Sequence, residues 1–380
     1  MRADNSVKFN QDGKLVIMQV SDTQDLVHTR LAMLQMLDAA YDKVKPDLVL
    51  FTGDNVLGNH LLDARIGTRK VAEGWQEEFD RIRKTLCQII IPLEDRKIPF
   101  GMIYGNHDDM NSVTKDEQAE IFRQYEYCLP MNTDNPDIDC DTYRIPVFSH
   151  DGKKLVFNLW MLDSAWYDKE KDKCFAAVKK ETVDWYNSEY KAIKKKYKKD
   201  VKSLMFLHIP LPQQEELIEK CEKHDEGAVK VGKNEYIRLN PQKAGGVLGE
   251  PVSVCEDEFG LFESVKQNGD VLAVVTGHDH SNCFDGTTQG VRMVQTPAAS
   301  FRCYGSDQRG VRLFILDENN PEEFETYTLN YKELCGNSPY AKFQYIWDAD
   351  DKIPEKCAMI AGFAAAACAG IAALVKLKKK

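Results

Sequence analysis

Residues 47–55 read DLVLFTGDN, a short apolar run that ends in a glycine, an acidic residue and an amide. A run of this length, rich in Val, Leu and Phe and closed by Gly, is typical of a strand buried on both faces. Asp54 would then stand in a tight turn at the carboxyl end of that strand. Taken alone, such a pair is most often only a turn, so its meaning depends on the rest of the chain.

The same pattern recurs before and after this stretch. Further apolar runs end in the clusters Ser21-Asp22-Thr23-Gln24, Gly105-Asn106-His107-Asp108, Asp163-Ser164, His208 and Gly277-His278-Asp279-His280. Segments with helical periodicity, residues 29–44, 75–89 and 181–197, lie between the runs. The alternation predicts an α/β fold with helices on the faces of a sheet. In such sheets the site lies at the carboxyl ends of the strands, where every cluster falls.

Two later apolar runs, residues 291–295 and 311–316, are expected to form a second sheet layered on the first. Residues 213–251 mix charge and glycine without clear periodicity. We expect them to form an insertion or a lid-like loop over the site.

Composition limits the possible partners. The 380 residues carry 60 acidic and 50 basic side chains, a formal net charge of −10, so no overall basic field indicates a nucleic-acid groove. The lysine-rich residues 191–202 are interpreted as a solvated helix face. A phosphate-bearing substrate would have to be attracted locally, and bound cations are one means.

The eleven cysteines have irregular spacing without a C-x-x-C pair, which favours free thiols in a reducing compartment. Residues 1–10 lack the apolar region of a secretory signal. These features favour a cytoplasmic location for the main domain.

The carboxyl-terminal end differs from the rest of the chain. Residues 357–375 are an unbroken apolar run rich in Ala and Gly, followed by a basic tail at 376–380. This length approaches the roughly 20 residues that span a bilayer. We predict a transmembrane anchor, preceded by a linker at 336–356. The alternative is a terminal helix packed on the domain or on a partner, in a soluble cytoplasmic protein.

The polar clusters together predict a dinuclear metal centre. Two ions about 3.5 to 4 Å apart need a shared carboxylate and a mixture of oxygen and imidazole donors. Asp54 is the expected bridge. One ion would be completed by Asn106, His208 and His278, and the other by Asp22 and His280.

The spacing of His278 and His280 sets a geometric condition. In an extended strand the two side chains would face opposite ways, so a turn is needed, and Gly277 would permit it. His107 is better placed as an acid or oxyanion donor toward a leaving group than as a ligand. Asp108 could orient the His107 imidazole.

This ordered set resembles the calcineurin-like metallophosphoesterase superfamily, whose blocks are D-x-H, G-D, G-N-H-D or G-N-H-E, a lone His, and G-H-x-H. The resemblance extends from about residue 14 to 316. Residues 51–55, 161–164, 208–212 and 276–280, with Trp185, are similar to the single-domain branch related to purple acid phosphatases. It implies a four-layer αββα sandwich, with two mixed β-sheets flanked by helices, over residues 1–335, and the ligand roles given above.

Two positions depart from the family pattern. Gln24 stands where the superfamily usually places a ligating His, and an amide is a weaker donor, so Gln24 is at most a weak ligand. Purple acid phosphatases have a Tyr three residues after the bridging Asp, and here that position is Leu57. We therefore expect no purple colour.

The function predicted from these features is metal-dependent hydrolysis of a phosphomonoester, on a phosphorylated small molecule or a phosphoprotein. The alternatives are a phosphodiesterase acting on nucleotides or lipid head groups, and a metal-binding scaffold without catalysis. Mixed Asp, Asn and His donors suit Mn, Fe or Zn. Residues 213–251 and 301–307 would wall the pocket, and His28 or His60 could line it.

Overall fold

The computed structural model describes residues 4–57, 74–132, 135–164, 166–167, 175–176 and 178–378. Side chains are described only up to residue 371, and not at residues 166–167, 175–176 and 370. His60 lies outside the described residues. The helices are α1 (Leu31–Val44), α2 (Trp75–Arg96), α3 (Lys115–Phe122), α4 (Lys180–Tyr197), α5 (Leu261–Asn268), α6 (Tyr331–Cys335), α7 (Pro339–Asp348) and α8 (Ile353–Lys378), with 3-10 turns η1 (Asp108–Met110) and η2 (Pro212–Leu217).

Two mixed sheets form the centre of the domain. The five-stranded sheet has the order β18 (Phe324–Asn330), β17 (Gly310–Asp317), β2 (Lys14–Val20), β3 (Leu48–Thr52), β4 (Phe100–Ile103). The eight-stranded sheet has the order β1 (Val7–Lys8), β5 (Tyr143–Phe148), β6 (Leu155–Met161), β9 (Lys202–Phe206), β14 (Val271–Thr276), β16 (Val291–Gln295), β15 (Cys283–Thr288), β13 (Ala244–Val247). β2, β3 and β4 run parallel, and so do β6, β9, β14 and β16. β7 (Trp166–Tyr167) pairs antiparallel with β8 (Phe175–Ala176).

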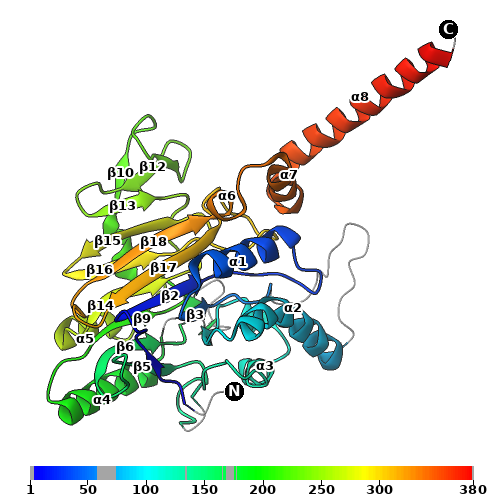
Figure 1. Ribbon diagram of the computed structural model, residues 1–380. Coiled ribbons are helices and arrows are strands. Elements are labelled where there is room, and N and C mark those ends of the chain that lie inside the picture. The colour runs from blue at the N-terminus through cyan, green and yellow to red at the C-terminus, as the bar shows by residue number, and fades with distance from the viewer. Residues whose placement is uncertain are drawn as a thin grey trace.

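The sheets pack face to face, with helices outside each of them (Figure 1). Between the sheets, the rings of Phe206 in β9 and Phe314 in β17 meet edge to face at 5.7 Å. The buried faces of α1, α2 and α3 belong to the same core as the five-stranded sheet, whereas α4 and α5 pack on the outer face of the eight-stranded sheet. The expected four-layer αββα sandwich is confirmed.

Sheet membership differs from the sequence-based expectation. Residues 291–295 and 311–316 were expected in one second sheet. Instead β16 pairs with β14 in the eight-stranded sheet, and β17 pairs with β2 in the five-stranded sheet. Periodicity identifies a buried strand, but it does not identify the partner, which comes from a distant part of the chain.

The insertion at residues 213–251 is also more regular than expected. It contains a small antiparallel sheet with the order β10 (Ile218–Cys221), β12 (Tyr236–Leu239), β11 (Val229–Lys230), and then β13 at the edge of the eight-stranded sheet (Figure 1). The prediction of a lid-like loop was therefore wrong. These strands are short and half-buried or exposed, so their sequences lack the apolar alternation that marks a strand.

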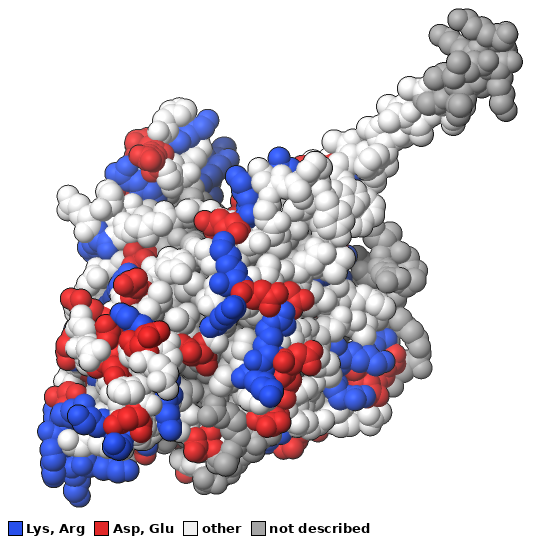
Figure 2. Space-filling model, in the orientation of Figure 1, with Lys and Arg blue, Asp and Glu red and all other residues white. Residues whose placement is uncertain are grey.

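Basic side chains concentrate over α4. Figure 2 shows them at one corner of the molecule, whereas acidic and basic residues are intermixed over the rest of that face. The α4 lysines are exposed, and Lys194 pairs with Asp200 at 2.8 Å. This arrangement agrees with a solvated helix face.

Asp270 is a buried anchor for the eight-stranded sheet. Its carboxylate accepts hydrogen bonds from Trp160 Nε1 at 3.0 Å, Ser203 Oγ at 2.8 Å and Tyr186 Oη at 2.6 Å. Burial nevertheless raises the pKa of the Asp270 carboxyl. One carboxylate thus connects β6, β9 and α4 at the start of β14.

Replacing Tyr186 by Phe should lower the free energy of unfolding by about 2 kcal/mol, because a buried carboxylate loses a donor. Urea unfolding followed by circular dichroism measures the change. Tyr327→Phe, at an exposed tyrosine, is the control and should stay within about 0.5 kcal/mol of the parent. Equal effects of the two substitutions would contradict the role given to Asp270.

The predicted linker at 336–356 contains α7, which packs on the domain. The Asp348 carboxylate accepts a hydrogen bond from the Ala32 backbone in α1 at 2.6 Å, and Asp351 pairs with the buried Arg309 at 2.7 Å. These contacts fix α7 beside the start of α1.

The apolar segment at 357–375 lies within α8, which runs away from the body of the molecule (Figure 1). Its described side chains are exposed or half-exposed, and Phe363 meets Phe343 of α7 edge to face. The described part of α8 is therefore mostly exposed beyond its contact with α7, and a helix packed on a partner stays a prediction. Among the residues that the structure describes, no helix is both long and apolar enough to cross a membrane, and the predicted anchor gains no support.

Candidate active site

The predicted site residues come from loops at the carboxyl ends of strands in both sheets. Asp22, Asp54 and Asn106 follow β2, β3 and β4 of the five-stranded sheet. His208 follows β9, and His278 and His280 follow β14, in the eight-stranded sheet. Backbone and side-chain contacts join these loops.

The contact between Asp22 and the β14 loop links the two sheets directly. The backbone N–H of His278 donates to Asp22 Oδ2 at 3.1 Å, and the hydroxyl of Ser21 donates to the same oxygen at 2.6 Å. The Asp22 backbone N–H donates to the Gly53 carbonyl at 3.1 Å. Asp22 is therefore fixed by groups from three loops.

Several of these residues have a left-handed backbone. The φ angles are +52° at Asp22, +52° at Asp54 and +73° at His278, and Gln24 has a φ of +31°. Non-glycine residues rarely adopt such angles, and they persist where the surrounding structure imposes them. Backbone strain thus gathers at the predicted ligands.

The turn that brings His278 and His280 to one side is made by His278 itself. We expected Gly277 to supply the turn, but His278 has a positive φ and Gly277 does not. Gly277 is needed for another reason, because a Cβ there would lie 2.0 Å from Ser21 Oγ. The glycine permits the close approach of the two sheets.

Glycines also allow the β3 loop to meet the β4 and β9 loops. A Cβ on Gly105 would lie 2.1 Å from Asp54 Oδ1, and a Cβ on Gly53 would lie 2.4 Å from His208 Nδ1. Neither position has room for a side chain.

Two groups of side chains could each hold a metal ion, and they share Asp54. One group contains Asp54, His208 and His278; the other contains Asp22, Asp54 and His280, with ligand atoms within 4.8 Å of one another in each group. His208 Nε2 lies 3.3 Å from Asp54 Oδ2, and His280 Nε2 lies 3.5 Å from Asp22 Oδ1. This is the shared-carboxylate arrangement that a dinuclear centre requires.

Backbone carbonyls orient two of the imidazoles. His208 Nδ1 donates to the Thr52 carbonyl at 2.9 Å, and His280 Nδ1 donates to the Tyr304 carbonyl at 2.9 Å. Because a carbonyl only accepts, Nδ1 carries a proton in both rings, and Nε2 is the nitrogen that faces the carboxylates. Metal-binding histidines commonly use their second nitrogen in this way.

Several donor atoms of the site are buried and make no hydrogen bond within the described structure. They are Asp22 Oδ1, Gln24 Oε1 and Asn106 Oδ1. Buried polar atoms normally have partners, so such a group at one place needs an explanation. Cation ligation would satisfy these atoms, since each is a suitable donor.

The electrostatics of the carboxylates and imidazoles depend on each other. Burial raises the pKa of Asp22. Burial acts in the same direction at Asp54, but the neighbouring imidazoles of His208 and His107 outweigh it and hold the pKa of Asp54 far below its usual range. Burial acts against protonation of His208, yet Asp54 and Asp22 raise its pKa to about 10. Burial and then His208 lower the pKa of His278 to about 3. A divalent cation held by the same atoms would supply the positive charge that these carboxylates require.

His107 lies against Asp54, and the chain that follows Asp54 orients its ring. Its backbone N–H donates to Asp54 Oδ1 at 2.8 Å, and its Nδ1 donates to the Leu57 carbonyl at 2.9 Å. The prediction that Asp108 orients this ring was wrong. Asp108 instead accepts hydrogen bonds from the backbone of Gly105 and Asn55, among others, and so joins the β3 and β4 loops.

Two residues at the edge of the site were not singled out by sequence. Tyr304 stacks on His280 with ring centres 4.4 Å apart, and its hydroxyl donates to Glu250 at 2.8 Å. Both lie in the segments expected to wall the pocket, 301–307 and 213–251.

His28 is exposed, and its carbonyl accepts a hydrogen bond from Arg302 at 2.7 Å.

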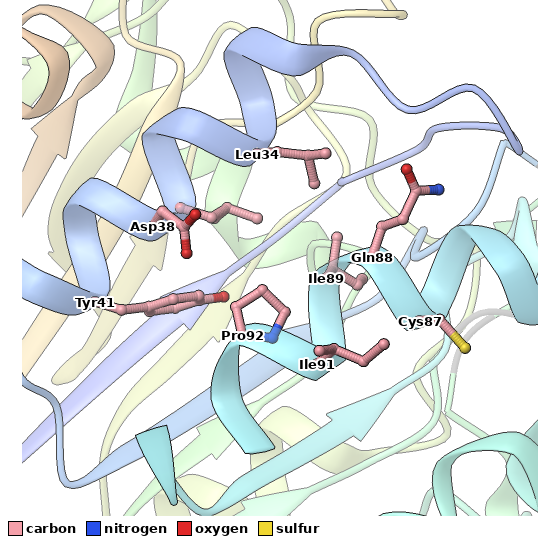
Figure 3. Close-up of a pocket in the computed structure, with 9 residues that line it drawn as sticks. Leu34, Asp38, Tyr41, Cys87, Gln88, Ile89, Ile91 and Pro92 are labelled. Carbon is pink, nitrogen blue, oxygen red and sulfur yellow. The ribbon is translucent and has the colours of Figure 1, made fainter. Parts of the chain in front are cut away.

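An apolar cleft of about 310 Å³ lies elsewhere, between α1 and α2 (Figure 3). Leu34, Tyr41, Ile91 and Pro92 are among the residues that line it. None of the lining residues belongs to the metal-binding groups.

A family model described as calcineurin-like phosphoesterase matches residues 15–282. The chain belongs to the calcineurin-like phosphoesterase family. The match covers every predicted ligand, and the family resemblance noted in the sequence is thereby confirmed. Membership supports a metal-dependent phosphoric ester hydrolase.

Relatives include proteins described as phosphatases and as inactive. "Probable inactive purple acid phosphatase 29" of Arabidopsis thaliana is 25% identical over 294 residues, which cover 72% of this chain and 65% of that protein. "Phosphatase DCR2" of Saccharomyces cerevisiae is 27% identical over 327 residues, which cover 78% of this chain and 50% of that protein. The chain thus spans half to just under two thirds of the length of these two relatives.

Among solved structures, a dimetal phosphatase from Danio rerio matches with a TM-score of 0.47 and 12% identity, over 83% of this chain and 99% of that one.

Replacing Gly105 by Ala should abolish metal binding at both positions, because the new methyl group displaces the shared Asp54 carboxylate. Metal content after gel filtration measures this. Gly245→Ala is the matched control, since a Cβ there meets no atom within 4 Å, and it should leave metal content unchanged. Retention of both ions by Gly105→Ala would contradict the placement of Asp54.

Metal ions should stabilise the folded chain. At a free ion concentration of 1,000 times the dissociation constant, binding adds about 4 kcal/mol. Differential scanning calorimetry after chelation and re-addition of Mn or Zn should show Tm rise by several degrees, and Asp54→Asn should remove most of that rise. An unchanged Tm in the parent chain would count against the site.

Proposed function

We propose that this chain is a phosphomonoesterase that uses a dinuclear metal centre and a metal-activated water. The observation that supports this is the position of Asp54, whose carboxylate belongs to both groups of candidate ligands. The proposed substrate is a phosphorylated small molecule or a phosphoprotein.

The chain's own residues would divide the two ions between them. Asp54, Asn106, His208 and His278 would hold one ion, and Asp22, Asp54 and His280 would hold the other. When bound, the ions would polarise a phosphoryl oxygen and lower the pKa of a water molecule. The carbonyls of Thr52 and Tyr304 keep the imidazole Nε2 atoms of His208 and His280 available for this.

His107 is proposed to protonate the leaving oxygen. Its backbone is fixed to Asp54 and its Nδ1 to the Leu57 carbonyl, so Nε2 is the nitrogen left to donate. The side chain is half-buried, which leaves it accessible from the site. General acid catalysis of this kind contributes about 10²- to 10⁴-fold in rate.

Charge supports a small or protein substrate over a nucleic acid. The net charge is −10, and the basic residues in Figure 2 gather over α4. α4 packs outside the eight-stranded sheet, whereas the ligands lie at the carboxyl ends of the strands.

A second candidate is a metal-binding protein without catalysis. Gln24 favours it, because an amide replaces the family's usual imidazole beside Asp22. Relatives described as inactive fit the same alternative.

Hydrolysis of an aryl phosphomonoester and an aryl phosphodiester tests the proposal. The full chain is treated with chelator and reloaded with Mn, Fe or Zn, with Asp54→Asn as the inactive control. We expect metal-dependent turnover of the monoester, absent from the control. Preference for the diester would replace the monoesterase by a phosphodiesterase, and no turnover in a folded, metal-loaded chain would favour the second candidate.

His107→Ala should reduce kcat by about 10²- to 10⁴-fold while the chain keeps both metal ions. Steady-state kinetics and metal content are measured on the same preparation. His28→Ala, at an exposed histidine, is the control and should retain parental kcat. Loss of metal together with activity in His107→Ala would make His107 a ligand rather than an acid.

A further inference from the structure

Gln24 lies inside the candidate site. Its side chain is 1% exposed, and its Nε2 donates to Asp54 Oδ2 at 2.6 Å. The donor must be the nitrogen, because an ionised carboxylate only accepts. The amide of Gln24 is thus anchored to the carboxylate that both ligand groups share.

The other end of the same amide has no hydrogen-bond partner in the described structure. Gln24 Oε1 is fully buried, and amide geometry keeps it within about 5 Å of Asp54 Oδ2. Asp22 Oδ1, which lies 3.5 Å from His280 Nε2, is likewise buried and has no hydrogen-bond partner among the described residues. Two buried oxygens beside one carboxylate form a suitable environment for a hard cation.

The backbone holds this arrangement from both sides. The Gln24 N–H donates to the Asp54 carbonyl at 2.9 Å, and the Gln24 carbonyl accepts a hydrogen bond from Ser300 Oγ at 3.3 Å. The left-handed φ of +31° at Gln24 is therefore imposed by contacts with two loops. The backbone that carries the Gln24 side chain is therefore fixed in place.

The two positions consequently differ in donor type. With Gln24 Oε1 as a ligand, the position of Asp22, Asp54 and His280 would have three oxygen donors and one imidazole. With Asn106 Oδ1 as a ligand, the other position would have two oxygens and two imidazoles. Carboxylate and carbonyl oxygens suit Mn and Mg, whereas imidazole suits Zn and Fe.

We propose that Gln24 is a metal-specificity residue, whose amide oxygen lowers the preference for Zn²⁺ over Mn²⁺ at the position of Asp22 and His280, so that this position takes Mn²⁺ when Mn²⁺ is in large excess while the position of His208 and His278 takes Zn²⁺. This inference rests on the dinuclear centre of the proposed function. Zn²⁺ binds most nitrogen- and oxygen-donor sites more tightly than Mn²⁺. Selectivity therefore means that the preference for Zn²⁺ is much smaller at the Gln24 position than at the other.

The test is competition loading of the full chain. Metal-stripped protein receives two equivalents of Zn²⁺ with a large excess of Mn²⁺, and bound metals are measured by elemental analysis after desalting. The parent chain should retain one Zn and one Mn, and electron paramagnetic resonance should show an uncoupled Mn²⁺ ion. Gln24→His should retain two Zn, which corresponds to at least a tenfold rise in Zn-over-Mn selectivity at that position.

Two further variants keep the test decisive if the histidine does not fit. Gln24→Glu keeps an oxygen donor and should still retain one Zn and one Mn, while Gln24→Ala should keep Zn and lose most of the Mn. Gln76→His, on the exposed face of α2, is the control and should behave as the parent. Asp22→Ala should lose Mn alone, which places Mn at the expected position.

Two bound Zn ions in the parent under these conditions, or parental Mn content in Gln24→Ala, would overturn the inference. Metal content needs no turnover, so the outcomes are separable. One Zn and one Mn without hydrolysis would contradict only the proposed phosphomonoesterase. Monoester hydrolysis with two Zn ions in the parent would contradict only the role of Gln24.

Discussion

The carboxylate of Asp54 is the contact on which the rest of the site depends. Its Oδ1 receives the backbone of His107, and its Oδ2 receives the Gln24 amide and lies 3.3 Å from His208 Nε2. A single side chain thus joins the loops after β2 and β3, the β4 loop of the same sheet, and the β9 loop of the opposite sheet. Burying such a charge is costly unless opposite charge or donors surround it, so these loops are positioned by the need to satisfy it.

Much of the architecture could be predicted from the sequence for a physical reason. Buried parallel strands are visible as apolar runs, and their carboxyl ends meet at one edge of each sheet, which brings the clusters after β2, β3 and β4 together and those after β9 and β14 together. The family resemblance supplied the four layers. The apolar pattern does not identify which strands pair, because β16 and β17 look alike as apolar runs but belong to different sheets.

Finer geometry was beyond sequence for a different reason. The left-handed turn at His278 and the orientation of the His107 ring by a Leu57 carbonyl depend on backbone groups, which every residue carries and which leave no mark in the residue type. Gly277 and Gly105 are required because neighbouring loops approach them closely, and not because the backbone there needs a positive φ. A glycine in a motif can serve either purpose, and only the neighbouring atoms distinguish them.

The distribution of the ligands along the chain has a consequence for biosynthesis. Asp22, Asp54 and Asn106 belong to the first part of the chain to leave the ribosome, whereas the imidazoles of His208, His278 and His280 are made much later. Neither candidate group is complete until β14 has been synthesised and the second sheet has packed on the first. A nascent chain therefore cannot complete either group of ligands before most of the domain has been synthesised.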